Sequence, residues 1–171
     1  MPALLATLFA IVLTQGTPQE YNASNLPKVN GPRPPSYADP AGSNADMSRS
    51  TARRGVIDAV ALPESDAITD SIIKDKIQGN AGWKAYQAIV PAGQTVKVRL
   101  TSPNETWFVL KTANQRGMTE KGMAPHSVTP INPQTTYVNS SKETKTIFFI
   151  VDTTDLSAPQ VPYSLHVTVG N

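Results

Sequence analysis

A short run of residues, Thr95–Thr101, alternates strictly between apolar and polar side chains. A period of two is typical of a β-strand with one buried face and one solvated face. A second β-rich run, residues 86–90, precedes it, and Pro91 and Gly93 lie between the two runs. Pro presets φ and Gly permits positive φ, so this connection has the composition of a tight turn. We therefore predict a hairpin over residues 86–101, around which the rest of the fold is organised.

More short β-rich runs, separated by Pro, Gly and Asn, follow along the chain. Residues 144–152 are apolar on both faces, which predicts a central strand covered on both sides. Residues 64–76 contain either a short helix or a strand, and we favour a strand over 72–77. The other candidate strands are residues 56–62, 105–112, 135–139 and 161–169. With at most one short helix, the pattern predicts an all-β fold, a jelly-roll-like antiparallel β-sandwich.

The chain divides into three parts. Residues 1–16 contain an uncharged apolar run of signal-peptide length, shorter than the about 20 residues of a membrane-spanning helix. Residues 17–54 are rich in Pro, Ser and Asn and predict a flexible leader, because such a run buries too little apolar surface to offset its ordering entropy. Residues 55–171 form the predicted sandwich domain. We expect export with cleavage and no stable membrane span afterwards; a buried N-terminal helix or an uncleaved anchor is the alternative.

Composition narrows the classes of function. The chain has no cysteine, which excludes disulfides, thiolate metal sites and a Cys nucleophile. An exported protein without disulfides is more typical of bacteria than of small eukaryotic secreted proteins. The net charge is only +2, and the 15 Lys and Arg residues are scattered. Since phosphate recognition needs clustered basic residues, no nucleic-acid partner is expected.

Two histidines, His126 and His166, are the natural candidates for catalysis. A Ser-His-Asp relay needs a positioned nucleophile, and the chain contains no Gly-x-Ser-x-Gly elbow. Neither histidine has a neighbour at metal-ligand spacing. We therefore expect both side chains at the surface, no catalytic residue, and a protein that is not an enzyme.

An acidic group suggests one metal site. Glu64, Asp66, Asp70 and Asp75 are close in sequence, and their oxygens suit Ca²⁺ when a loop gathers them. Because they lack the periodicity of a calcium loop, a solvated strand edge is the alternative. Apart from this calcium site at Asp66, Asp70 and Asp75, no cofactor is expected.

Three aromatic residues are candidates for a binding surface. Trp83, Trp107 and Tyr137 are the aromatics that the strand pattern places outside the core. Exposed aromatic rings stack on sugars or fill protein interfaces. Packing in the core is the competing interpretation for each of them.

The order of motifs resembles the bacterial pre-peptidase C-terminal domain. The resemblance rests on Tyr86 with the Val-Pro-Ala-Gly turn at 90–93, the Trp-Phe-Val-Leu run at 107–110, and the final Tyr-Ser-Leu-His-Val-Thr-Val at 163–169. It implies a small secreted, non-catalytic β-sandwich with roles in substrate or matrix binding, secretion and stability. Two positions depart from the family pattern: Ala88 replaces a large aromatic, and Lys84 stands near the usual Asp, so a calcium site is not carried over.

The sequence thus predicts a non-enzymatic exported β-sandwich domain that acts in binding or assembly at the cell exterior or in the periplasm. The expected partner is a protein or a polysaccharide at the cell surface, and the chain is compatible with an oligomer. Two alternatives stay open. One is a structural subunit of a surface filament or layer that uses strand addition; the other is a carbohydrate-binding module.

Overall fold

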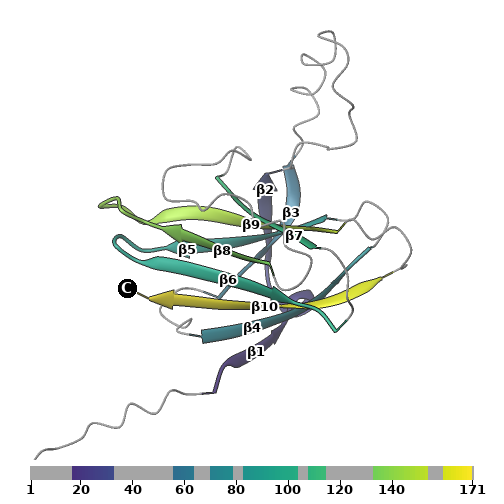
Figure 1. Cartoon of the computed structure of the whole chain (residues 1–171). Helices are drawn as coiled ribbons and strands as arrows, with labels where there is room; N and C mark the ends of the chain where they lie inside the picture. Colours follow the sequence, from purple (N-terminus) through teal and green to yellow (C-terminus); the bar gives the residue numbers. More distant parts are fainter. Residues whose placement is uncertain are drawn as a thin grey trace, which may run out of the picture.

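The computed structural model describes residues 17–32, 56–63, 70–78, 83–103, 108–114, 133–153 and 160–170. They form two five-stranded sheets packed face to face (Figure 1). Sheet A contains, in spatial order, β1 (Gln19–Asn22), β4 (Asp70–Ile77), β10 (Val161–Gly170), β6 (Thr95–Thr101) and β8 (Gln134–Val138). Sheet B contains β2 (Lys28–Pro32), β3 (Val56–Ala61), β5 (Trp83–Val90), β9 (Lys145–Thr153) and β7 (Phe108–Ala113). The predicted all-β sandwich is confirmed.

Most neighbouring strands run antiparallel. The two exceptions are β1 on β4 and β3 on β5, which pair in parallel. From β3 onward each strand lies in the opposite sheet from the strand before it, so successive strands alternate between the two sheets. The inner faces therefore come from residues far apart in sequence.

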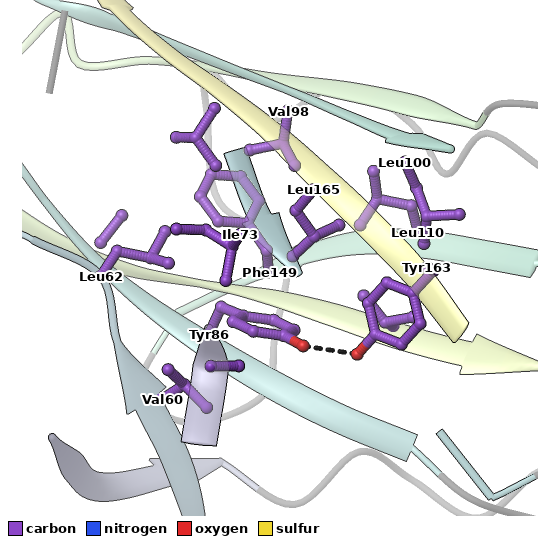
Figure 2. Close-up of a cluster of buried hydrophobic side chains, with 14 of the residues drawn as sticks. Val60, Leu62, Ile73, Tyr86, Val98, Leu100, Leu110, Phe149, Tyr163 and Leu165 are labelled. Atoms are coloured by element: carbon purple, nitrogen blue, oxygen red, sulfur yellow. Dashed lines mark hydrogen bonds between the residues drawn. The ribbon is translucent and has the colours of Figure 1, made fainter. Parts of the chain in front are cut away.

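Apolar side chains from both inner faces fill the space between the sheets (Figure 2). The predicted alternation holds in β6 and β10, whose inward residues are buried: Val96, Val98, Leu100, Tyr163, Leu165 and Val167. In β9 all residues of 147–151 are buried, as predicted for a strand covered on both sides. On its outer face, Phe148 and Ile150 form a second apolar cluster with small residues of neighbouring strands, Ala59, Ala85 and Ala113.

The predicted hairpin over residues 86–101 is wrong, although its turn is present. Gly93 has φ 76°, and the Gln94 amide donates to the Pro91 carbonyl at 3.3 Å. However, β5 and β6 do not pair, because β5 bonds to β9 in sheet B while β6 bonds to β10 and β8 in sheet A. In a hairpin, β5 and β6 would be neighbours in one sheet, and their apolar faces would lie on the same side of that sheet. Placing the two strands in facing sheets instead lets the apolar face of each strand pack into the core between the sheets, which buries both faces.

Asn139 holds this crossing in place. Its side chain is fully buried, and Nδ2 donates to the carbonyls of Val90, Pro91 and Glu143 at 2.8, 2.9 and 2.9 Å. Its backbone amide donates to the Gln94 carbonyl at 2.9 Å. The β5–β6 and β8–β9 connections are thereby joined at one end of the sandwich.

Residues 17–32, which we name the N-terminal arm, were predicted to be part of a flexible leader, and this is corrected. The arm contributes β1 to sheet A, the 3₁₀ turn η1 (Ala23–Asn25) and β2 to sheet B. Ala23 is 1% exposed and packs in the main core, with Tyr21 and Leu26 against it. The prolines of the arm precede or end its strands, so they do not interrupt pairing.

The rest of the predicted leader, residues 33–54, and the signal-like segment 1–16 lie outside the described residues. Within the described ranges, no helix has the length and apolar character needed to cross a membrane.

Candidate functional site

The three predicted aromatic residues do not form an exposed surface that the structure describes. Tyr137 is only 3% exposed, because alternation along β8 turns it inward with Thr135. The expectation that Tyr137 lies outside the core is therefore wrong. Trp107 lies outside the described residues, and Trp83 is placed only by its backbone, at the start of β5.

The predicted acidic group is divided between the two faces of β4. Asp75 shares the inward side with Ser71, Ile73 and Ile77, whereas Asp70 lies on the outward side. Asp66 lies outside the described residues. The described part of the chain holds no group of three or more His, Cys, Asp or Glu placed to bind a metal. Asp70 and Asp75 lie on opposite faces of β4, so the predicted calcium site does not form from Asp66, Asp70 and Asp75 together.

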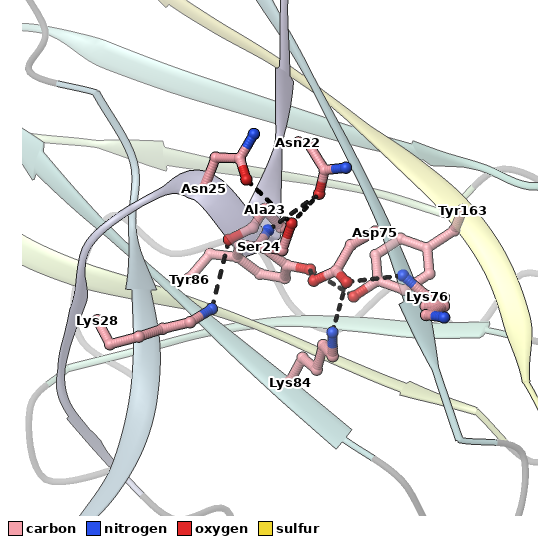
Figure 3. A network of polar contacts seen from close by, with 10 residues as sticks. All are labelled: Asn22, Ala23, Ser24, Asn25, Lys28, Asp75, Lys76, Lys84, Tyr86 and Tyr163. Carbon is pink, nitrogen blue, oxygen red and sulfur yellow. Dashed lines mark hydrogen bonds and ion pairs between the residues drawn. The ribbon is translucent and has the colours of Figure 1, made fainter.

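Asp75 instead joins the two sheets through a polar network (Figure 3). Its carboxylate accepts hydrogen bonds from the Tyr86 hydroxyl and the Lys76 amide, both at 2.7 Å, and pairs with the Lys84 ammonium. The Tyr86 hydroxyl also contacts the Tyr163 hydroxyl from the facing sheet. A lysine ammonium therefore engages the carboxylate that the calcium prediction had assigned to a metal.

The phenols in this network are held neutral. Burial raises the pKa of Tyr86 well above its usual value of 10.0, and the nearby Tyr163 and Asp75 raise it further. Burial, followed by the charge of Asp75, raises the pKa of Tyr163 in the same way. Because Tyr86 is fully buried and Tyr163 is 2% exposed, a ligand does not reach them. The two phenols of the network therefore lie within the core, where they join the two sheets.

Polar side chains gather on the outer face of sheet A, within the part of the chain that the structure describes. The outward side chains of this sheet lie in cross-strand rows set by the register of β8, β6 and β10. One row is Thr136, Lys97 and Thr168; the next is Gln134, Arg99 and His166. Each cation therefore lies between two side chains that donate or accept hydrogen bonds.

These rows line a half-open hollow of about 300 Å³. The residues around it are Lys97, Val98, Arg99, Gln134, Thr135, Thr136, His166 and Thr168. Val98 and Thr135 turn inward and are 1% and 2% exposed, so the side chains that line the hollow on its open side are the six polar ones. We refer to this site as the sheet-A hollow.

His166 lies at the edge of the sheet-A hollow and is paired. Its Nε2 is hydrogen-bonded to Oδ1 of Asp70 on β4. The two side chains are 37% and 34% exposed, so this is a solvated pair. Among the described residues, no Ser or Thr hydroxyl is hydrogen-bonded to the imidazole. The arrangement lacks the aligned hydroxyl and buried carboxylate that a Ser-His-Asp relay uses.

Sequence reasoning did not identify the sheet-A hollow. It placed Lys97 and Arg99 on the wet face of a strand and expected His166 on the outward side of another. The order of the strands in the sheet could not be predicted from the sequence. About 60 residues of chain separate β6 from β10, yet the two strands pair directly. The only local signal was the Lys-x-Arg spacing, which is common on solvated strands.

Comparison with known proteins concerns the fold. No family model and no curated protein matches the sequence. Among solved structures, a periplasmic inhibitor of g-type lysozyme from Aeromonas hydrophila is similar, with 16% identity, a TM-score of 0.47, and coverage of 66% of this chain and 96% of that one. The pre-peptidase C-terminal domain of a collagenase from Bacillus anthracis has 11% identity, a TM-score of 0.45, and coverage of 66% and 92%. A pre-peptidase C-terminal domain, the kind of domain that the sequence motifs resemble, is thus among the similar solved structures.

Proposed function

We propose that this protein is a non-enzymatic, exported β-sandwich domain that binds a partner at the cell exterior or in the periplasm through the outer face of sheet A. One observation carries the proposal: Lys97 and Arg99 lie side by side at the sheet-A hollow, and neither forms an ion pair with another described residue. Charged side chains without partners, beside neutral hydrogen-bonding groups in a concave site, are available to a ligand. Export is supported by the uncharged apolar run in residues 2–16.

The non-enzymatic part of the proposal is supported by the chemistry of the sheet-A hollow. Its histidine is engaged by a solvated carboxylate, and its hydroxyls belong to threonines with no base hydrogen-bonded to them. The same groups are well suited to hold a ligand by hydrogen bonds and charge.

Sedimentation of the purified protein with envelope material from the producing cells tests the binding function. We expect the wild-type protein to sediment and the double variant Lys97→Glu/Arg99→Glu to stay in solution. The double variant Lys74→Glu/Lys142→Glu reverses the same number of charges at exposed positions outside the hollow, and we expect this matched control to sediment like wild type. Absence of wild-type sedimentation, or equal loss in the control, argues against the proposal. Hydrolytic activity that disappears in His166→Ala would show an enzyme instead.

A second candidate is assembly by exchange of the N-terminal arm between copies. Two observations favour it. The arm supplies an edge strand to each sheet, and residues 33–55 separate the arm from β3 in the chain. The same strands added to a neighbouring copy would link subunits. Light scattering over a range of concentrations tests this candidate, since a monomer at every concentration contradicts it.

A further inference from the structure

The sheet-A hollow has a regular arrangement of charge. Lys97 and Arg99 are two residues apart on β6, which places them about 7 Å apart on the same face. Their cross-strand neighbours on β8 and β10 lie about 5 Å to either side. A ligand in the hollow therefore meets two cations in the middle and neutral hydrogen-bonding groups at both sides.

The negative charges nearby are already paired. On the outer face of sheet A, Asp70 is bonded to His166, and Glu20 forms an ion pair with Lys74 at 2.6 Å. No carboxylate is among the residues that line the hollow. The excess charge at the site is positive, so a ligand with an anionic group is favoured over a neutral or cationic one. Arg99 is the residue suited to hold a carboxylate through two parallel hydrogen bonds.

The shape and the lining favour a sugar over a protein surface. Protein interfaces are anchored by large apolar and aromatic side chains, whereas the only apolar residue at the hollow, Val98, is buried in the core. A volume of about 300 Å³ is at the small end of ligand sites and suits a single protruding unit. Thr136, Thr168 and Gln134 offer donors and acceptors that match sugar hydroxyls.

We infer that the sheet-A hollow binds a carboxylated sugar unit of an acidic polysaccharide. The carboxylate lies at Arg99 and Lys97, and the ring hydroxyls bond to the neutral side chains of β8 and β10. This inference rests on the proposed binding function and names the ligand class for the same site. It differs from the aromatic stacking surface predicted from Trp83 and Trp107, because charge and hydrogen bonds provide the recognition.

Calorimetric titration of the whole chain with oligogalacturonate tests the inference. Methyl-esterified oligogalacturonate is the matched ligand, since it keeps the sugar and removes the charge. We expect binding to the acid form that weakens as salt is added, and at least about tenfold weaker binding to the ester. Dextran sulfate and duplex DNA are further probes, and both are expected to bind more weakly than the acid sugar.

Variants locate the site. Arg99→Gln and Lys97→Gln each remove one cation from an exposed position and are expected to weaken oligogalacturonate binding about tenfold or more. Thr136→Val removes a hydroxyl without changing charge, and we expect a loss of about threefold to tenfold. Lys74→Gln, on the same face but paired with Glu20, and Lys142→Gln are the charge controls, with affinity close to wild type. Thermal melting of each variant confirms that the fold is retained.

Several results would overturn the inference. Equal binding of the acid and ester forms removes the role of charge, and equal or tighter binding of dextran sulfate or DNA shows a general polyanion surface. No binding of oligogalacturonate, with envelope sedimentation still dependent on Lys97 and Arg99, refutes the ligand class and leaves the proposed function standing. If sedimentation is also absent, both fail.

Discussion

Tyr86 in sheet B donates its phenol hydrogen to Oδ2 of Asp75 in sheet A at 2.7 Å, inside the sandwich. Together with the contact between the Tyr86 and Tyr163 hydroxyls and the ion pair of Asp75 with Lys84, this bond joins the two layers through polar groups. These groups lie within a core made mostly of apolar side chains (Figure 2). Lys84 pairs with the other carboxylate oxygen of Asp75, Oδ1. The Tyr86 hydroxyl is therefore the side-chain donor at Oδ2.

Removing the phenol hydroxyl tests this link. Tyr86→Phe leaves the ring in the core and deprives the Asp75 carboxylate of a donor, so we expect the free energy of unfolding to fall by about 1–3 kcal/mol. Tyr21→Phe is the matched control, because its hydroxyl makes no hydrogen bond to a described residue, and its stability stays near wild type. Denaturant unfolding at neutral pH measures both. Equal stability of Tyr86→Phe and wild type would contradict the network.

Alkaline pH should act on the same pair of phenols. In the unfolded chain they ionise near 10.0, and in the folded protein their pKa values are higher. Above pH 10 the unfolded chain therefore releases protons that the folded chain keeps. The free energy of unfolding is at its full value below that pH and falls as the pH rises beyond it. Unfolding free energies on both sides of pH 10 measure the slope. We expect a smaller slope in Tyr86→Phe; an unchanged slope would show that Tyr86 titrates normally.

Asn139 gives a prediction for the crossing between the sheets. Asn139→Asp replaces a buried donor of hydrogen bonds to three carbonyls with a carboxylate that only accepts. We expect a loss of about 3 kcal/mol in stability. Asn30→Asp, at an exposed position of β2, is the control for the added charge. A melting temperature of Asn139→Asp equal to that of Asn30→Asp would contradict the assigned role.

Ala23 tests whether the N-terminal arm is part of the fold. Ala23→Asp puts a charge into the core beside Tyr21 and Leu26, and we expect it to destabilise by more than about 3 kcal/mol or to release the arm. Ser24→Asp, one residue further along and exposed, is the matched control. If both variants melt like wild type, the arm does not pack and the original prediction of a flexible leader is restored. Limited proteolysis after residue 32 gives an independent measure.

Local patterns predicted most strands but not their partners. β6 was predicted with the observed bounds, and the double-sided apolar run of 144–152 correctly indicated a central strand. These features depend on side-chain period, which is local. Whether β5 pairs with β6 or crosses to the other sheet depends on distant groups such as Asn139, and the hairpin prediction failed for that reason.

Composition misled the prediction for the arm. The Pro, Ser and Asn content of residues 17–54 indicated a leader, but Tyr21, Ala23, Leu26 and Val29 of residues 17–32 pack in or against the two apolar clusters of the sandwich. Burial there is a tertiary effect that an isolated segment does not reveal. The candidate site was missed for a related reason, since its rows exist only once β8, β6 and β10 are aligned.

The position of a bound ligand tests directly whether the sheet-A hollow is the binding site. Amide chemical shifts of the labelled protein, followed by NMR during titration with oligogalacturonate, report which surface makes contact. We expect changes centred on β6, β8 and β10, largest near Arg99, Lys97, Thr136 and His166, with the outer face of sheet B unaffected. Changes centred on sheet B, or no changes at saturating ligand, would contradict this expectation.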